Sequence, residues 1–316
     1  MTKPKLSVGL PVYNGERYLR QALDSLVSQD FDDFELIISD NASTDGTAEI
    51  CRDYASRDKR IRYLRVEENR GVTWNFRRVL EVAEGKYFKW AAHDDECYPT
   101  MLRRCVEVMD QADSSVMLVY PRFEFIDEAG AVIMTKVDPN WDRVETTARM
   151  PHQRMAHVIW RNFFGQAIYG IIRTDYLRRT TPFGKITPDW IKLAELSMLG
   201  HILEVPEVLF RLRRHGGNSA AQFQQWQELL AWHEPGAGAN SPRVSYQTAI
   251  VMEYLKAVRH LRLPLMEKLL CFRVALTTLP SRRIWFKLLR VSGSARIWLQ
   301  GMTGWRWLSR TGASSK

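Results

Sequence analysis

The stretch KLSVGLPVYNGE, residues 5–16, decides the fold class, because it joins an apolar run to a polar turn that leads into a helix. Its run Leu6–Pro11 has the length and apolar character of a buried strand. The segment Glu16–Ser28 follows, with apolar residues on one face at helical spacing. A strand, a polar turn and an amphipathic helix in this order are typical of a βαβ unit.

The same alternation continues toward the C-terminus. Further strands are predicted at Phe34–Ser39, Ile61–Val66, Tyr87–Ala91, Val116–Tyr120, Gln166–Arg173 and Glu207–Arg213. Further helices are predicted at Thr47–Tyr54, Trp74–Ala83, Met101–Met109 and Asp189–Leu199, with a hairpin and a short helix between Phe123 and Arg161. The sequence therefore predicts an α/β fold, with a Rossmann-like, mostly parallel sheet flanked by helices.

Turn-forming residues divide the chain into two regions. The breaks are HGGNS (215–219) and EPGAGANSP (234–242), and the pattern beyond them is helical. We expect an α/β domain over residues 1–225 and a basic, Trp-rich helical extension over residues 240–316. The net charge of +9 belongs to this extension, because Lys268–Lys316 holds ten Lys and Arg and no Asp or Glu.

The basic extension favours contact with an anionic membrane surface, because aromatic rings suit the headgroup boundary and cations attract anionic lipid. The residues concerned are Trp285, Phe286, Trp298, Trp305 and Trp307 among Arg282, Arg283, Lys287, Arg290, Arg296, Arg306 and Arg310. The alternatives are helices that pack on the α/β domain or that form a homodimer. No apolar run reaches the roughly 18–20 residues of a membrane-spanning helix, and the residues before the first predicted strand hold no apolar stretch of the length that a signal peptide needs. We expect a cytoplasmic protein, peripheral on the inner face of the membrane.

Polar and acidic residues follow four successive predicted strands. They are VYNGE (12–16), DNASTDG (40–46), ENRG (68–71) and HDDE (93–96). Because ligands of open α/β sheets bind at the carboxyl ends of the strands, these segments predict one shared cleft. The glycine-rich phosphate loops GxGxxG and GxxxxGK[ST] are absent from the sequence. A carboxylate-lined cleft that binds a diphosphate needs a divalent cation, so we expect Mn²⁺ or Mg²⁺.

Three of these motifs carry a family resemblance. PVYNGE (11–16), SDNASTDGT (39–47) and AAHDDECYP (91–99), in this order and spacing, resemble family 2 of the inverting glycosyltransferases, which have the GT-A fold. The resemblance covers about residues 5–219 and makes the α/β domain the catalytic domain. It implies transfer of a sugar from a nucleotide-diphosphate sugar to a hydroxyl of a glycan or lipid-linked acceptor. It favours a uridine donor, although guanosine and thymidine donors also occur in the family.

The resemblance assigns roles to donor-binding residues. Asp40 matches the carboxylate that accepts a hydrogen bond from the nucleotide base, with Pro11, Tyr13 and Glu16 lining that pocket. Asn69, after the third predicted strand, is also placed among the donor-binding residues. The HisAspAsp segment resembles the family's Asp-x-Asp motif, whose last Asp binds the metal on the diphosphate. That residue is Asp94 here, and Asp95 joins it at the donor site, whereas Ala92 stands where the first Asp is usual.

The resemblance also covers the acceptor side. Asp189 matches the general base, and RLRRH (211–215) resembles an Arg-x-His ending whose His215 would bind the metal or a phosphate. A base that removes the acceptor proton and a metal that stabilises the departing diphosphate together imply direct displacement with inversion.

Simpler structural roles compete with these assignments. Asp40 would also suit a turn cap, Asp189 a helix N-cap, and His215 an ordinary surface position. Asp94 and Asp95 would suit a solvated pair at a helix start. Two other functions remain as alternatives. A sugar nucleotidyltransferase usually has a basic, glycine-rich loop after the first strand, which is missing here. A nucleic-acid-binding protein would use the basic extension, but the acidic cleft argues against it, so no nucleic acid is expected.

Overall fold

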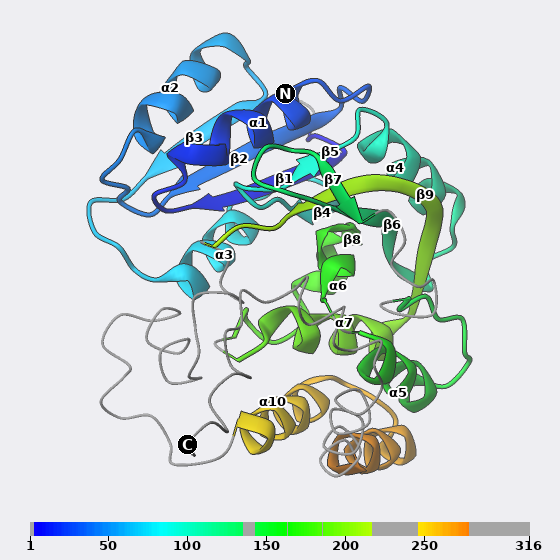
Figure 1. Cartoon of the computed structure of the whole chain (residues 1–316). Helices are drawn as coiled ribbons and strands as arrows, with labels where there is room; N and C mark the ends of the chain where they lie inside the picture. The colour runs from blue at the N-terminus through cyan, green and yellow to red at the C-terminus, as the bar shows by residue number, and fades with distance from the viewer. Residues whose placement is uncertain (1–2, 135–142, 163, 185, 217–245, 278–316) are drawn as a thin grey trace, which may run out of the picture.

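A computed structural model describes residues 3–134, 143–162, 164–184, 186–216 and 246–277 of the protein. Within these ranges the chain forms one sheet covered by helices on both faces, with two further helices below (Figure 1). The strand order is β3-β2-β1-β4-β8-β6-β9-β5, and β7 pairs with β6 at the side of this path. The predicted α/β class, a GT-A-like sheet flanked by helices with a C-terminal helical extension, is confirmed.

The first half of the chain builds the parallel part of the sheet. Its elements are β1 (Leu6–Val12), α1 (Glu16–Val27), β2 (Phe34–Asp40), α2 (Thr47–Arg57), β3 (Ile61–Arg65), α3 (Val72–Glu81) and β4 (Tyr87–Trp90). Strands β1 and β2 pair in parallel with Val12 opposite Asp40, so the two polar segments that follow them begin side by side. These elements agree with the predicted ones within a few residues at each end.

The second half makes the sheet mixed. Its elements are β5 (Glu96–Cys97), α4 (Met101–Gln111), β6 (Val116–Ile126), β7 (Val132–Met134), α5 (Pro151–Arg161), the 3-10 helix η1 (Gln166–Tyr169), β8 (Ile171–Arg173), α6 (Thr174–Leu177), α7 (Pro188–Leu199) and β9 (His201–Arg213). The long strands β6 and β9 are parallel to each other, whereas β8 runs antiparallel to both β4 and β6. The parallel arrangement therefore holds for β3-β2-β1-β4 and for β6-β9, and β8 joins the two groups.

The predicted strand Gln166–Arg173 is wrong in its first half. Gly165 has φ of +75°, in the left-handed region, and turns the chain into the 3-10 helix η1. Only Ile171–Arg173 then enters the sheet. This turn brings Tyr169 toward the carboxyl ends of the strands, where the acidic residues lie.

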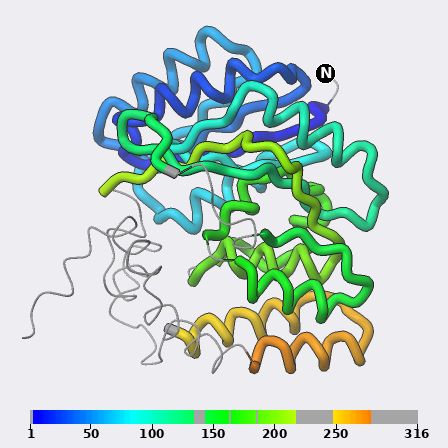
Figure 2. The backbone as a smooth tube through the Cα atoms, turned by 45° about the vertical axis from the view of Figure 1, so that its right-hand side comes forward, coloured from blue at the N-terminus to red at the C-terminus, as the bar shows by residue number. Residues whose placement is uncertain are grey.

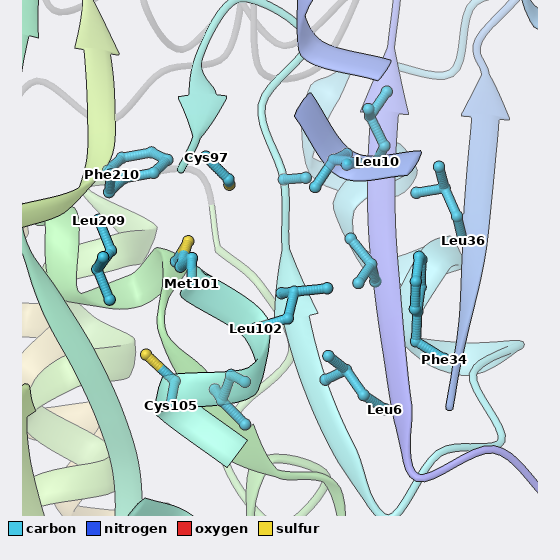
Figure 3. Close-up of a cluster of buried hydrophobic side chains, with 14 of the residues drawn as sticks. Leu6, Leu10, Phe34, Leu36, Cys97, Met101, Leu102, Cys105, Leu209 and Phe210 are labelled. Carbon is cyan, nitrogen blue, oxygen red and sulfur yellow. The ribbon is translucent and has the colours of Figure 1, made fainter. Parts of the chain in front are cut away.

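Separate hydrophobic clusters cover the two faces of the sheet. On one face, leucines of β1, β2 and α1 pack with α2 and α4, as Figure 3 shows for Leu6, Leu10, Leu36 and Leu102. On the other face, α3, α5, α6 and α7 pack against side chains that include Phe88 and Trp90 of β4. A side chain on β4, or on residues 116–121 of β6, is therefore buried whichever way it points, which explains the mostly apolar character of these segments.

A third cluster attaches the C-terminal helices to the α/β domain. Helix α10 (Tyr246–His260) and a helix over residues 265–277 pack against α5 and α7, on the side away from the sheet (Figures 1 and 2). None of the helices in the described part of the chain has the length and apolar character to cross a bilayer. The predicted domain limits at 225 and 240, and the Trp-rich residues 282–310, lie outside the described ranges.

Candidate active site

The segments after β1 and β2 are held together by hydrogen bonds. Asn14, at φ of +50°, donates its backbone N–H to Oγ of Ser43 at 2.9 Å and accepts the Thr44 N–H at 2.8 Å through Oδ1. The Gly15 N–H donates to Oγ1 of Thr47 at 2.9 Å. Short polar side chains thus satisfy the backbone of both turns, which fixes the geometry at this strand end.

Asp40 lies at the end of β2 and is fully buried. Its Oδ1 accepts the Ser43 N–H at 2.8 Å, and its Oδ2 accepts the Tyr63 hydroxyl at 2.7 Å and Nη1 of Arg65 at 3.1 Å. Burial and the bond to Asp40 raise the pKa of Tyr63 to about 12, so this phenol stays a donor. Asp40 therefore caps the turn that follows β2, through its hydrogen bond from the Ser43 N–H. Each carboxylate oxygen has two lone pairs, so Oδ1 also retains capacity for a ligand donor.

The other predicted base-pocket residues lie on the strand beside β2 or contact residues near Asp40 in the chain. Pro11 is buried on β1 opposite Ser39, and Tyr13 follows it with an exposed ring. Glu16, at the start of α1, accepts the N–H of Gly46. Oδ1 of Asn69 accepts Nδ2 of Asn41 and the Gly71 N–H, both at 2.8 Å. The structure thus ties the third strand end to the residue next to Asp40.

The acidic segment after β4 lies against the first turn and the end of β9. A Cβ added to Gly15 would lie 2.7 Å from Cδ2 of His93, which leaves no room for a side chain at residue 15. Nε2 of His215 lies 2.9 Å from Oδ2 of Asp94. Burial opposes ionisation of Asp94, but the charge of His93 and the hydrogen bond from His215 outweigh it, so the pKa of Asp94 lies below its usual value.

Asp95 has a different role from Asp94. It is buried, and its Oδ1 accepts the backbone N–H of Arg213 at 2.9 Å. Burial and the neighbouring Asp94 carboxylate raise the pKa of Asp95 well above its usual value. Asp95 therefore anchors the acidic segment to β9, whereas Asp94 carries the charge.

Arg213 is the arginine of the Arg-x-His ending within RLRRH (211–215), and its contacts go beyond the role that this motif implies. Its side chain is fully buried, and Nε donates to the Asp94 carbonyl at 2.8 Å. Nη1 donates to the carbonyls of Asp127 and Glu128 at 3.0 Å, and Nη2 forms an ion pair with Glu96. The alternation of Arg211, Leu212 and Arg213 at the end of a strand was the available signal, because it places two cations on one face.

Asp189 is the second residue of α7, and the N-cap position belongs to Thr187. The competing N-cap role for Asp189 is therefore not what the structure shows. Burial raises the pKa of Asp189 to about 6, against the opposing effect of the first backbone N–H groups of the helix. Gly165 lies directly against Oδ2 of Asp189, where a Cβ atom would collide with the carboxylate.

Tyr169 links the acidic segment with Asp189. Burial, and after it the charges of Asp95, Asp94 and Asp189, raise the pKa of Tyr169 well above its usual value. Its ring stacks on Phe210 at 5.4 Å, and Nζ of the buried Lys89 lies 5.9 Å from the ring centroid. The structure thus brings the carboxylates of residues 94, 95 and 189 into the surroundings of one phenol. Tyr169 was not predicted as a site residue, because the sequence pattern indicates a strand over Gln166–Arg173.

The metal-ligating side chains fit a divalent cation only if a bound ligand, such as a diphosphate, supplies further oxygen atoms. Among the described residues there is no group of three or more His, Cys, Asp or Glu side chains that would hold a metal alone. Asp94 supplies one carboxylate and His215 one imidazole, with Oδ2 of Asp94 lying 2.9 Å from Nε2 of His215. The carboxylate of Asp95 already accepts the backbone N–H of Arg213 on β9. Mg²⁺ bound through one or two carboxylates and substrate phosphates needs no larger protein set, so these residues fit a metal–diphosphate.

The sequence resembles known glycosyltransferases. The family model described as Glycosyl transferase family 2 matches residues 7–176. An uncharacterized glycosyltransferase of Rickettsia prowazekii (strain Madrid E) is 34% identical over 125 residues, covering 40% of this chain and 38% of the relative. The uncharacterized glycosyltransferase YibD of Escherichia coli (strain K12) is 30% identical over 170 residues, covering 51% of this chain and 48% of the relative. The chain thus spans less than half the length of these relatives.

Solved structures share the fold. TarS 1–349 of S. aureus, in complex with UDP-GlcNAc, aligns with a TM-score of 0.56 and 19% identity, over 88% of this chain and 82% of that one. The mannosyltransferase PcManGT of Pyrobaculum calidifontis, in complex with GDP-Man and Mn²⁺, aligns with a TM-score of 0.55 and 17% identity, over 95% and 84% of the two chains. At these identities the likeness shows the fold alone.

Proposed function

The chain belongs to glycosyl transferase family 2, and from this premise we propose that it transfers a sugar from a nucleotide-diphosphate sugar to an acceptor hydroxyl with inversion. The observation that carries the proposal is the contact of Asp94 with His215 at 2.9 Å, which joins the acidic segment after β4 to the end of β9, where Asp95 is also bound. One charged carboxylate next to an imidazole suits the donor diphosphate. A second carboxylate, with a pKa of about 6, suits a general base.

The donor would bind across the ends of β1, β2 and β4. We assign Asp40 to the nucleotide base, together with Pro11, Tyr13, Glu16 and Asn69, because hydrogen bonds and strand pairing place these residues around one strand end. The bound UDP-GlcNAc of TarS supports a uridine donor, and the GDP-Man of PcManGT keeps a guanosine donor as the alternative.

Asp94 and His215 would hold a divalent cation, Mn²⁺ or Mg²⁺, on the donor diphosphate. A bound cation would supply stabilisation of the negative charge on the departing diphosphate. Arg213 and Asp95 would keep Asp94 in place, because they fasten the acidic segment to β9 and to the carbonyls of residues 127 and 128.

Asp189 would accept the proton of the attacking acceptor hydroxyl. Its raised pKa of about 6 makes it a stronger base than an exposed carboxylate, while it remains mostly ionised at neutral pH. Attack in one step on the face opposite the diphosphate inverts the anomeric centre. A glycan or lipid-linked acceptor fits the hydroxyl chemistry.

The test is a panel of nucleotide sugars with the full chain and Mn²⁺ or Mg²⁺. We expect slow donor hydrolysis without acceptor for one donor, and an anomeric configuration in the first product, read by NMR, that is opposite to that of the donor. Thermal stabilisation by UDP, GDP or dTDP with metal should exceed that by the matching triphosphate. Preferential stabilisation by a triphosphate, with pyrophosphate release from it and a sugar phosphate, would replace the proposal with nucleotidyl transfer.

A further inference from the structure

The helix over residues 265–277 has one exposed face that combines apolar and cationic side chains. Arg262, Met266, Leu269, Arg273 and Leu276 are exposed and follow one another at spacings of three and four residues. This spacing places Met266, Leu269, Arg273 and Leu276 on a single stripe of the helix, and Arg262 lies exposed in the segment just before the helix begins. We call this stripe, with its neighbours Arg262 and Leu265, the 262–276 face.

The apolar members of this face are unusually open to solvent. Leu265 is 75% exposed, Met266 68%, Leu269 53% and Leu276 54%. Single exposed leucines are common on protein surfaces, but four large apolar side chains along one stripe indicate a surface that contacts something. The opposite side of the same helix is already occupied, because Cys271 and Ala275 are fully buried against α5, α7 and α10.

The 262–276 face carries no negative charge of its own. Glu267 is the last acidic residue of the sequence, and it points inward, where its Oε2 lies 2.8 Å from Nδ1 of His152 at the start of α5. Arg262 and Arg273 stay exposed beside the leucines. Inward placement of the one carboxylate of this helix leaves an outer surface with exposed leucine, methionine and arginine side chains and no exposed carboxylate.

The sequence continues this chemistry beyond the helix. Residues 278–316 contain no Asp or Glu, and they add eight further Lys and Arg. Trp285, Trp298, Trp305 and Trp307 lie among them. Apolar side chains, arginines and tryptophans without carboxylates are the composition that binds at the headgroup boundary of an anionic bilayer.

We propose that the 262–276 face docks on the surface of an anionic lipid bilayer, with the helix lying parallel to that surface. The leucines and Met266 would enter the headgroup boundary, and Arg262 and Arg273 would contact lipid phosphates. A helix of this length extends only about 20 Å, which suits lying on a membrane and is too short to cross one. The proposal does not depend on the sugar transfer proposed above, because its test measures binding alone.

The experiment is co-sedimentation of the full chain with vesicles of phosphatidylcholine and phosphatidylglycerol, compared with pure phosphatidylcholine, at low and high salt. We expect binding to the anionic vesicles that weakens with salt. Met266→Gln with Leu269→Gln should weaken the partition at least ~10-fold, because two apolar side chains are lost from the boundary. Arg262→Gln with Arg273→Gln should weaken it roughly 30-fold, since each cation near anionic lipid changes the partition about fivefold.

Matched controls remove the same groups elsewhere on the surface. Ile133→Gln with Val208→Gln removes two exposed apolar side chains from β7 and β9, where the exposed fractions are 52% and 38%. Arg52→Gln with Arg57→Gln removes two exposed cations from α2. Both controls should sediment with vesicles as the unchanged chain does, and all variants should keep the circular dichroism spectrum and melting temperature of the unchanged chain.

Three outcomes would overturn the proposal. The full chain would stay in the supernatant with anionic vesicles at low salt. Alternatively, the variant Met266→Gln with Leu269→Gln would bind vesicles as well as the unchanged chain does. That result would assign the binding to residues 278–316 and not to the 262–276 face. Finally, analytical ultracentrifugation without lipid would show a dimer that the same variant dissociates, which makes the face a contact between two copies.

Discussion

Nε2 of His215 lies 2.9 Å from Oδ2 of Asp94, although 121 positions separate the two residues in the chain. The pair joins the segment after β4 to the end of β9, and it lies where the proposed donor diphosphate needs a cation. We predict that Asp94→Ala weakens metal-dependent binding of the nucleoside diphosphate at least about 10-fold, and that His215→Ala has a smaller effect in the same direction. Isothermal titration with and without Mn²⁺ measures this, with the exposed Asp32→Ala as control. Unchanged affinity in Asp94→Ala would remove Asp94 from the donor site.

Gly165 should be required for the position of the proposed base. A methyl group at residue 165 would collide with Oδ2 of Asp189, and φ of +75° disfavours any side chain there. We expect Gly165→Ala to lower turnover at least ~100-fold by displacing the carboxylate, and to cost about 1–2 kcal/mol of stability. Gly184→Ala is the matched control, because nothing lies within 4 Å of its Cβ position. Binding of donor by both variants should be close to that of the unchanged chain, and normal turnover by Gly165→Ala would contradict the assignment.

The pH dependence should report the base. Because the pKa of Asp189 is raised to about 6, kcat/KM should fall as pH drops through 6 and be roughly tenfold below its plateau at pH 5. Asp189→Asn should lower transfer at least about 100-fold and leave donor binding nearly intact. A profile that is flat between pH 5 and 8 would exclude Asp189 as the titrating base.

The raised pKa of Asp189 predicts that the stability of the fold decreases over the pH range in which kcat/KM increases. A carboxyl whose pKa is higher in the folded than in the unfolded state binds more protons when folded, so its contribution to stability decreases as pH rises from about 4 to about 6. Asp189→Asn cannot ionise and avoids this loss. We therefore expect the variant to melt at a higher temperature than the unchanged chain at pH 8, and at a similar temperature at pH 4. If Asp189→Asn and the unchanged chain melt at the same temperature at both pH values, ionisation of Asp189 does not destabilise the folded state.

Arg213 should stabilise both the fold and the acidic segment. Its guanidinium is fully buried and binds carbonyls of residues 94, 127 and 128 as well as Glu96. We expect Arg213→Met to lower the free energy of unfolding by about 3–5 kcal/mol, because three carbonyls lose a buried donor and Glu96 keeps only Arg211 as an ion-pair partner. Urea denaturation measures the change, and Arg57→Met, on the exposed face of α2, should shift it by less than about 0.5 kcal/mol. A loss below 1 kcal/mol would mean that water replaces the guanidinium.

The sequence by itself determined the elements of the N-terminal sheet and the positions of the polar segments after its strands. Each strand from Leu6 to Trp90 is a local pattern of apolar residues, and each polar segment follows directly from it. The carboxyl ends of parallel strands meet at one edge of a sheet, so this local pattern predicts that Asp40 and Asp94 lie at the same edge.

Only the tertiary structure decided which residues of the second half lie beside the acidic segment after β4. The turn at Gly165 places Tyr169 and Asp189 near the acidic segment, and β9 brings Arg213 and His215 to Asp94 and Asp95. These contacts depend on the antiparallel insertion of β8 and on the pairing of β9 with β6, which join segments far apart in the chain. The different pKa shifts of Asp94 and Asp95 have the same origin, because burial and partner charges are set by residues from other elements. A periodic pattern records which side of an element is buried, but not which distant side chain lies against it.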